Sequence, residues 1–244
     1  MNITSSYRIK ITGDLKALEN SIRMYRDALH FVIPIVHTHW DEMKDFEYSN
    51  QRMAYAEKLI HSTKTNQARY DFDTEFPKFP TYLHRALLNC AIGVVSSYRS
   101  NLANWEKEPE GQAPQLSLNH YACPAYYRSR SFRNFDPVRQ TIELKVFKNG
   151  DWVYETYKLK TSDCTYYQTH LTGKKQNVPT IQKKGRRFYV AFSYEEKVEL
   201  VKDESISKIC AVDLGLNTDA TCTIMGQDGT VYARKFISFS KEHD

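Results

Sequence analysis

The stretch Thr141-Ile-Glu-Leu-Lys-Val-Phe-Lys-Asn-Gly-Asp-Trp-Val-Tyr154 decides the fold of the central part of this chain. Apolar residues alternate with polar ones from Ile142 to Val146, as in a strand with one buried face. Asn149-Gly150 is the strongest short signal for a two-residue hairpin turn, and the alternation resumes after it at Trp152. The stretch therefore predicts two antiparallel strands joined by a tight turn.

A second hairpin is predicted on the carboxyl side of the first. Residues 178–182 have strand character, residues 183–187 form a Lys-Lys-Gly-Arg-Arg tip, and apolar residues alternate again from Phe188 to Tyr194. Several short strands at this spacing favour a small barrel or sandwich.

The residues before the first hairpin have a mainly helical period. A short strand from Tyr7 to Ile11 is followed by apolar residues at helical spacing, which begin after Asp14, a suitable N-cap, and stop at Pro34. A weaker helical signal covers residues 49–61. Residues 71–80 are predicted to be a loop, because two prolines disfavour helix in the residues before them.

The most strongly predicted helix begins beside Pro80. One apolar stripe runs along this helix, formed by Leu83, Leu87, Ala91, Val94, Tyr98, Leu102 and Trp105. We expect the stripe to face the core and the opposite face, with His84, Arg85 and Arg99, to stay available for contacts. Residues 106–114 are rich in Glu, Pro, Gly and Gln and predict a boundary.

Charge is distributed unevenly along the 244 residues, although the net charge is only +5. Residues 120–194 contain 14 Lys and Arg against five Asp and Glu, so the excess of positive charge is concentrated there. Such asymmetry predicts a face that binds a polyanion.

The five cysteines are scattered along the chain, include no C-x-x-C pair and are odd in number. This pattern favours a reduced, cytoplasmic protein, and it predicts no zinc site in this chain. Neither a signal peptide nor an apolar run of membrane-spanning length is present in the sequence, so we expect no membrane partner.

Two segments of the basic region are candidates for nucleic-acid binding. Residues 120–135 interleave aromatic residues with arginines, and bases stack on both kinds of side chain. The hairpin tip adds a run of cations suited to phosphate contacts. An arrangement of core aromatics with solvated, solubilising cations is the alternative in both places. The candidate residues are Tyr126, Tyr127, Arg128, Arg130, Lys174, Lys175, Lys183, Lys184, Arg186 and Arg187.

A third candidate lies near the carboxyl end, where Asp213 interrupts a nearly continuous apolar run formed by Ile206, Ile209, Cys210, Ala211 and Val212. A carboxylate beside such a run is costly unless it is paired, hydrogen-bonded or bound to a metal, and a simple turn or cap is the alternative. Two further strands are predicted, at residues 220–225 and 230–236, with a turn at residues 227–229.

Together these parts resemble the TnpB proteins of bacterial insertion sequences and the related type V CRISPR effector nucleases. The resemblance rests on Tyr7-Arg-Ile-Lys-Ile11, Pro80-Thr-Tyr-Leu-His-Arg-Ala-Leu-Leu88, Val178-Pro-Thr-Ile-Gln182, Arg187-Phe-Tyr-Val-Ala191 and, most specifically, Cys210-Ala-Val-Asp-Leu-Gly-Leu-Asn-Thr-Asp-Ala220. It implies an α+β fold: an oligonucleotide-binding-like wedge β-barrel from residues 1–12 and 115–204, a helical recognition insertion at 13–114, and the first strands of a ribonuclease-H-like (RuvC) domain at 205–244.

The resemblance also implies a function, that of an RNA-guided, Mg²⁺-dependent DNA endonuclease whose partners are a guide RNA and a double-stranded DNA target. His84 and Arg85 would contact nucleic acid, and Asp213 would be the first of three acids that bind Mg²⁺. The other two acids and the zinc ribbon of that family have no counterpart here, so we expect a front portion that lacks most of the nuclease domain. Its enzyme activity stays open, and a non-cleaving RNA- or DNA-binding protein is the alternative.

Overall fold

The computed structural model describes residues 2–199, 208–214 and 220–238, and it has a mixed α+β fold. These residues form two compact units. One comprises Thr4–Glu196, and the other contains the residues from Lys197 onward together with Asn2 and Ile3. The predicted α+β class is therefore confirmed. Among the described residues, none of the helices combines the length and the apolar character needed to cross a bilayer.

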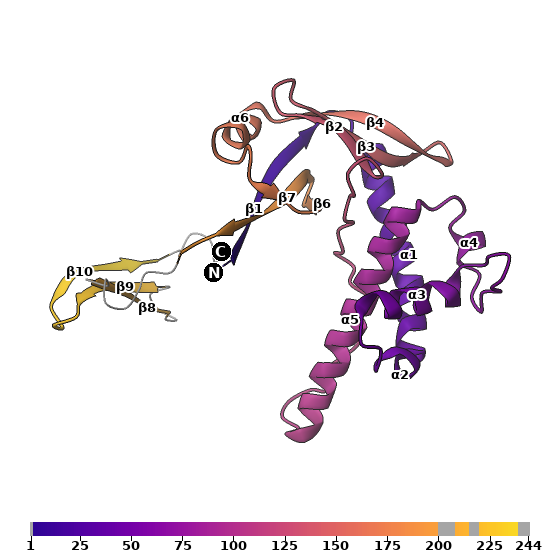
Figure 1. Cartoon of the computed structure of the whole chain (residues 1–244), viewed down its shortest axis with the longest axis horizontal. Coiled ribbons are helices and arrows are strands. Elements are labelled where there is room, and N and C mark those ends of the chain that lie inside the picture. Colours follow the sequence, from indigo (N-terminus) through magenta and orange to yellow (C-terminus); the bar gives the residue numbers. More distant parts are fainter. Residues whose placement is uncertain (1, 200–207, 215–219, 239–244) are drawn as a thin grey trace. The chain divides into compact units, whose positions relative to one another are not determined.

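The larger unit is built on a curled antiparallel sheet (Figure 1). Its strands follow the order β2-β3-β4-β1-β7-β5, with β6 paired to β7. Their bounds are β1 Asn2–Thr12, β2 Phe132–Asp136, β3 Thr141–Lys148, β4 Asp151–Leu159, β5 Lys175–Gln176, β6 Thr180–Lys184 and β7 Arg187–Lys197.

Both predicted hairpins are confirmed. In the first, Lys148 lies opposite Asp151, so Asn149 and Gly150 form a two-residue turn with φ values of 52° and 81°. Positive φ at both turn positions is the geometry that twists with the strands, which explains the Asn-Gly signal. In the second hairpin, β6 and β7 pair throughout, and a two-residue loop joins them.

The helices of this unit are α1 Lys16–Thr38, α2 Trp40–Met43, α3 Ser49–Ile60, α4 Phe72–Glu75, α5 Thr81–Lys107 and α6 Thr161–His170. The prediction that Pro34 ends the first helix is wrong, because α1 continues through it. A proline inside a helix costs about 3 kcal/mol. Ile33, Ile35 and Val36 are buried around it, and burial of each such side chain contributes about 1.5–3 kcal/mol, which offsets that cost.

Two further differences concern short helices. The short helix α4 occupies part of the predicted loop at residues 71–80, and its N-cap Asp71 accepts a hydrogen bond from the Thr74 backbone N–H at 3.2 Å. The helix α6 was not predicted at all. Cys164 is its buried residue among mostly polar neighbours, so the segment lacks an apolar stripe.

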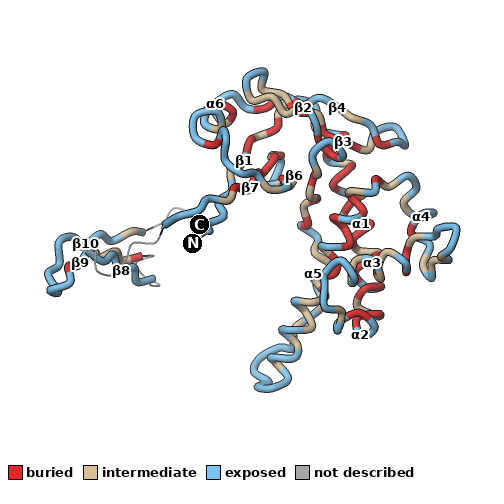
Figure 2. Tube along the Cα trace, viewed as in Figure 1, coloured by how far each residue is buried: buried red, intermediate tan, exposed pale blue. Residues whose placement is uncertain are grey.

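Buried residues gather in two clusters, as Figure 2 shows. One joins the inner face of the sheet to the start of α1, and the other lies between α1, α3 and α5. Ser21 of α1 links helix to sheet, because its Oγ accepts a hydrogen bond from the Phe147 backbone N–H at 2.7 Å. The predicted stripe of α5 is buried at Leu83, Leu87 and Ala91, whereas its second half is only partly buried.

The smaller unit contains a three-stranded antiparallel sheet in the order β10-β9-β8. The strands are β8 Lys208–Asp213, β9 Ala220–Gly226 and β10 Val231–Ile237, and Gly229 supplies a positive φ of 81° in the turn between the last two. The predicted strands are thus confirmed within the described residues. Ile206 and the motif residues 215–219 lie outside them.

Candidate nucleic-acid interface

A cluster of exposed arginines and half-buried tyrosines lies where the start of α5 meets the segment before β2. Its centre is Tyr82. The guanidinium carbons of Arg85 and Arg130 lie 5.3 and 5.4 Å from the centroid of the Tyr82 ring, and the Tyr127 ring lies 5.5 Å away, centroid to centroid. Two cations and a second aromatic ring therefore meet on one tyrosine.

A second centre of the same kind adjoins the first. The Arg133 guanidinium carbon lies 3.9 Å from the centroid of the Tyr154 ring, and the Lys145 ammonium lies 5.6 Å from it. The Tyr154 hydroxyl donates a hydrogen bond of 2.9 Å to the backbone carbonyl of Arg130, which joins the two centres. We call the set the arginine–tyrosine surface, consisting of Tyr82, Arg85, Tyr127, Arg130, Arg133, Lys145 and Tyr154.

Local structure explains why these side chains meet. Tyr82 and Arg85 are three residues apart in the first turns of α5, so they lie on one face of that helix. The backbone N–H groups of Arg130 and Ser131 both donate to the Tyr127 carbonyl, at 3.2 and 2.8 Å, which folds the loop into a tight turn. That turn holds Arg130 against the ring of Tyr82.

Glu143 is a carboxylate in contact with this surface. It accepts hydrogen bonds from the Asn134 amide at 2.7 Å and from Arg133 Nε at 2.6 Å. These two hydrogen bonds hold the pKa of Glu143 below its ordinary value, so it stays ionised and orients Arg133. Arg85, Arg130 and Lys145 contribute the remaining positive charge of the surface.

This arrangement suits nucleic acid. A guanidinium held over a tyrosine ring at an exposed site is worth about 0.5–1 kcal/mol, so the cations are pre-positioned without being buried. Each arginine presents donors in a planar fork that matches phosphate oxygens. Aromatic rings beside such cations offer stacking positions for bases, worth about 1–3 kcal/mol each.

The structure brings together three of the predicted residues, Arg85, Tyr127 and Arg130. Tyr82 and Tyr154 were not predicted, although the spacing of Tyr82 three residues before Arg85 is a signal present in the sequence. Arg128 is exposed, but the cations that lie over the Tyr82 and Tyr154 rings are Arg85, Arg130, Arg133 and Lys145.

Tyr126 is a core residue, which corrects its prediction as a base-stacking side chain. Its side chain is fully buried, and its hydroxyl donates a 2.9 Å hydrogen bond to the Lys145 carbonyl. Burial raises the pKa of this hydroxyl. The folded chain turns Tyr126 inward and leaves Tyr127 half-buried at the surface, a choice that the sequence pattern alone left undecided.

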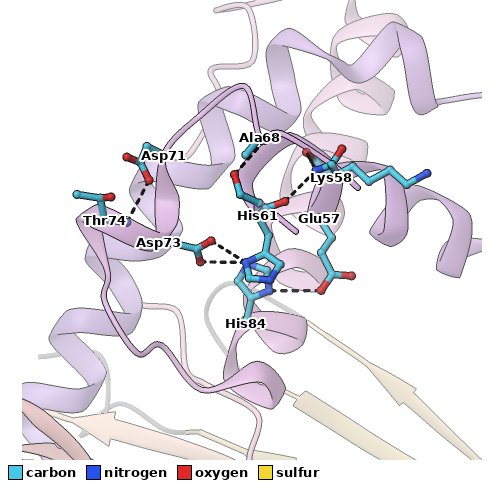
Figure 3. Close-up of polar contacts among 10 residues, drawn as sticks. Glu57, Lys58, His61, Ala68, Asp71, Asp73, Thr74 and His84 are labelled. Carbon is cyan, nitrogen blue, oxygen red and sulfur yellow. Dashed lines mark hydrogen bonds and ion pairs between the residues drawn. The ribbon is translucent and has the colours of Figure 1, made fainter. Parts of the chain in front are cut away.

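His84 is also buried, contrary to the expectation that it lies on the free face of its helix. Leu87, Leu88 and Ala91 follow it at helical spacing and are buried too, so His84 belongs to the edge of the core stripe. Figure 3 shows its Nδ1 directed toward Glu57 Oε1, at 3.9 Å, and its ring beside His61. Burial lowers the pKa of His84.

The hairpin tip between β6 and β7 projects its cations into solvent. Gly185 has a φ of 56° at the first loop position, where two-residue hairpin turns require a positive φ and favour glycine. Lys184, Arg186 and Arg187 are exposed, whereas Lys183 leans back onto helix α1 and forms an ion pair with Glu19.

Lys174 and Lys175 resemble Lys183, and differ from the exposed Lys184, Arg186 and Arg187, because each has a carboxylate beside it. Lys174 Nζ lies 2.9 Å from a Glu196 oxygen, and Lys175 Nζ lies 2.6 Å from a Glu195 oxygen. These ion pairs with β7 reduce the positive potential that the two lysines offer to a phosphate.

Asp213 is the last residue of β8, lies opposite Thr221 of β9 and is exposed. Within residues 2–199, 208–214 and 220–238, no three His, Cys, Asp or Glu side chains are grouped in a way that would hold a metal ion. One carboxylate does not by itself fit a two-metal site.

The fold and surface define a mixed α+β protein with a basic, tyrosine-rich face. The chain belongs to the Aq_aa04 family, whose family model matches residues 3–148. That match includes α1 to α5 and most of the arginine–tyrosine surface, and it ends before the second hairpin and Asp213. No curated protein matches the sequence.

Proposed function

We propose that this chain binds nucleic acid as the guide-RNA- and DNA-binding part of a TnpB-type, RNA-guided DNA endonuclease of a transposable element, and that it acts in the cytoplasm. The observation that carries the proposal is the arginine–tyrosine surface. It combines cations for phosphates with rings for bases on a rigid support of helix, turn and sheet.

Two further features support the proposed TnpB-type assignment. The curled antiparallel sheet of Thr4–Glu196 is compatible with an oligonucleotide-binding-like barrel that carries the helices as an insertion. The antiparallel meander β8 to β10, with Asp213 at the end of its first strand, is compatible with the opening of a ribonuclease-H-like domain. Asp213 would then be a Mg²⁺ ligand in a complete nuclease domain.

A second candidate function is binding of RNA or DNA without cleavage. The arginine–tyrosine surface and the hairpin tip both lie in the unit Thr4–Glu196, whereas Asp213 lies in the other compact unit. Binding therefore depends on residues that are structurally separate from the proposed catalytic carboxylate, and it would persist without it.

The binding proposal is tested with Arg130→Ala and a matched control, Arg139→Ala. Both remove one arginine charge from an exposed position, but Arg139 is outside the arginine–tyrosine surface and pairs with Asp136 at 3.6 Å. Fluorescence anisotropy with labelled RNA and DNA should give tight, salt-dependent binding by the unmodified protein and weakening by Arg130→Ala alone. Absence of salt-dependent binding, or equal weakening by both variants, refutes the proposal.

The nuclease assignment has its own test. In the protein as its gene encodes it, loaded with guide RNA, Asp213→Asn should abolish Mg²⁺-dependent cleavage of target DNA and leave DNA binding unchanged. Cleavage at the unmodified rate by Asp213→Asn contradicts the assignment. An unmodified protein that binds guide RNA and target but does not cut supports the non-cleaving function.

A further inference from the structure

A basic groove runs along the polar face of α1, a helix that the sequence patterns did not mark as part of a site. Lys16, Asn20, Arg23 and His30 follow one another at intervals of four, three and seven residues, so they share one face of the helix. Lys183 of β6 also lines this cleft, which has a volume of about 450 Å³. We call it the α1 groove.

The charges of the groove favour an anion. Lys183 and Glu19 neutralise each other in an ion pair. Of the remaining charged residues that line the groove, Lys16, Arg23 and Arg26 contribute cations and Asp27 contributes a carboxylate. Arg26 Nε donates a 3.0 Å hydrogen bond to the Ala122 carbonyl, which fixes the guanidinium at the wall of the groove.

Lys183 belongs both to the groove and to the hairpin tip, in which Lys184, Arg186 and Arg187 are exposed. Along α1 the distance from Lys16 to His30 is about 21 Å, at about 1.5 Å per residue. This length exceeds the spacing of neighbouring phosphates along a nucleic-acid strand, so the groove is long enough to contact more than one of them.

Aromatic rings adjoin the groove at His30, the lining residue farthest along α1 from Lys16. The rings of His30 and His120 meet edge to face with centroids 4.5 Å apart. Tyr121 follows directly and is 87% exposed. Burial, followed by the charge of His120, lowers the pKa of His30, so this ring stays neutral near pH 7. An exposed tyrosine that follows this ring pair directly in the chain offers a stacking position for an unpaired base.

We propose that the α1 groove binds a single-stranded polynucleotide, with its phosphates along Lys16, Arg23 and Arg26 and a base stacked on Tyr121. This proposal rests on the nucleic-acid-binding function proposed above and adds a second site to it, on another part of the same unit. The ligand is a single strand, because a base that is paired and stacked within a duplex does not offer its face to Tyr121.

The test uses two variants and one control. Lys16→Ala/Arg23→Ala removes two exposed cations of the groove, and Tyr121→Ala removes the ring. Lys64→Ala/Lys107→Ala removes two exposed cations elsewhere in the same unit. Each protein is titrated with single-stranded RNA, single-stranded DNA and duplex DNA of about 12 nucleotides, within the range of common single-strand site sizes, and its melting curve confirms folding.

The double groove variant should lower the slope of log K against log salt by about 1.4, which corresponds, referred to 1 M salt, to a loss of roughly 25-fold at about 0.1 M salt. Tyr121→Ala should weaken single-strand binding about 5- to 150-fold without changing that slope. The control should retain the unmodified affinity. Tighter binding of RNA or of DNA identifies which single strand is the natural ligand.

Two outcomes overturn the groove proposal. One is a duplex that binds as tightly as the single strands and is weakened equally by the groove variants. The other is unchanged binding by both groove variants while Arg130→Ala weakens it, which leaves the proposed function standing. A protein that binds none of the three oligonucleotides refutes the proposed function itself.

Discussion

The hairpin tip allows the sharpest test of electrostatic binding, because the chain offers a matched pair of variants. Arg186→Ala/Arg187→Ala removes two exposed cations from a two-residue turn and from the strand position beside it. Lys174→Ala/Lys175→Ala removes the same charge near the same sheet, but at lysines that are paired with Glu196 and Glu195.

The expected magnitude follows from counterion release. Each phosphate neutralised on a single strand contributes about 0.7 to the slope of log K against log salt, so two contacts contribute about 1.4. Referred to 1 M salt, the tip variant should bind roughly 70-fold more weakly near 50 mM salt and roughly tenfold more weakly near 200 mM. The paired lysines should contribute less than half of this slope, because their carboxylates already neutralise them.

The assay is a salt series of anisotropy titrations for the unmodified protein and both double variants. A tip variant that loses affinity by the same factor at every salt concentration would contradict phosphate contacts, since only the loss of counterion release changes the slope. Equal slopes for the two double variants would show that net charge, and not the exposed tip, determines binding.

Three further predictions concern stability. The lowered pKa of His84 means that the folded state binds fewer protons than the unfolded state on acidification. The stability present above about pH 6.5 should therefore fall as the pH is lowered below that value. Melting temperatures measured across this pH range should show the decrease, and His84→Gln should make them less dependent on pH. Tyr126→Phe should cost about 0.5–1.5 kcal/mol in urea unfolding by removing the hydrogen bond to Lys145, while RNA affinity stays the same. Gly150→Ala should cost about 1–2 kcal/mol because φ is 81° there, and an unchanged unfolding midpoint would contradict the turn geometry.

The hairpins were predictable because their signals are local. Asn149-Gly150 satisfies the positive φ of its turn by itself, and the period-2 alternation on either side fixes the register. The start of α5 beside Pro80 is local in the same sense. These elements need no knowledge of what packs against them.

The helix α6 shows why other elements were not predictable. Its stability depends on β1, which is distant in sequence: Asp163 accepts a 3.0 Å hydrogen bond from the Lys10 backbone N–H, and Tyr166 stacks on Tyr7 with centroids 4.6 Å apart. Helix propensity depends on the local sequence alone and cannot predict this hydrogen bond, which joins residues 153 positions apart. Tertiary packing overrides a weak helical signal here, as the burial around Pro34 overrides a helix breaker in α1.

The candidate interface was predictable only in part, because surface charge is a property of the folded chain. Counting charges along the sequence found the hairpin tip but not the cations of α1. Lys183 and Glu19 are 164 positions apart, and their ion pair brings the tip and α1 together. The strand order places β7 beside β1, and α1 follows β1 directly. The topology of the sheet therefore joins two basic segments that no window of sequence contains, and variants of α1 and of the tip should affect the same bound strand.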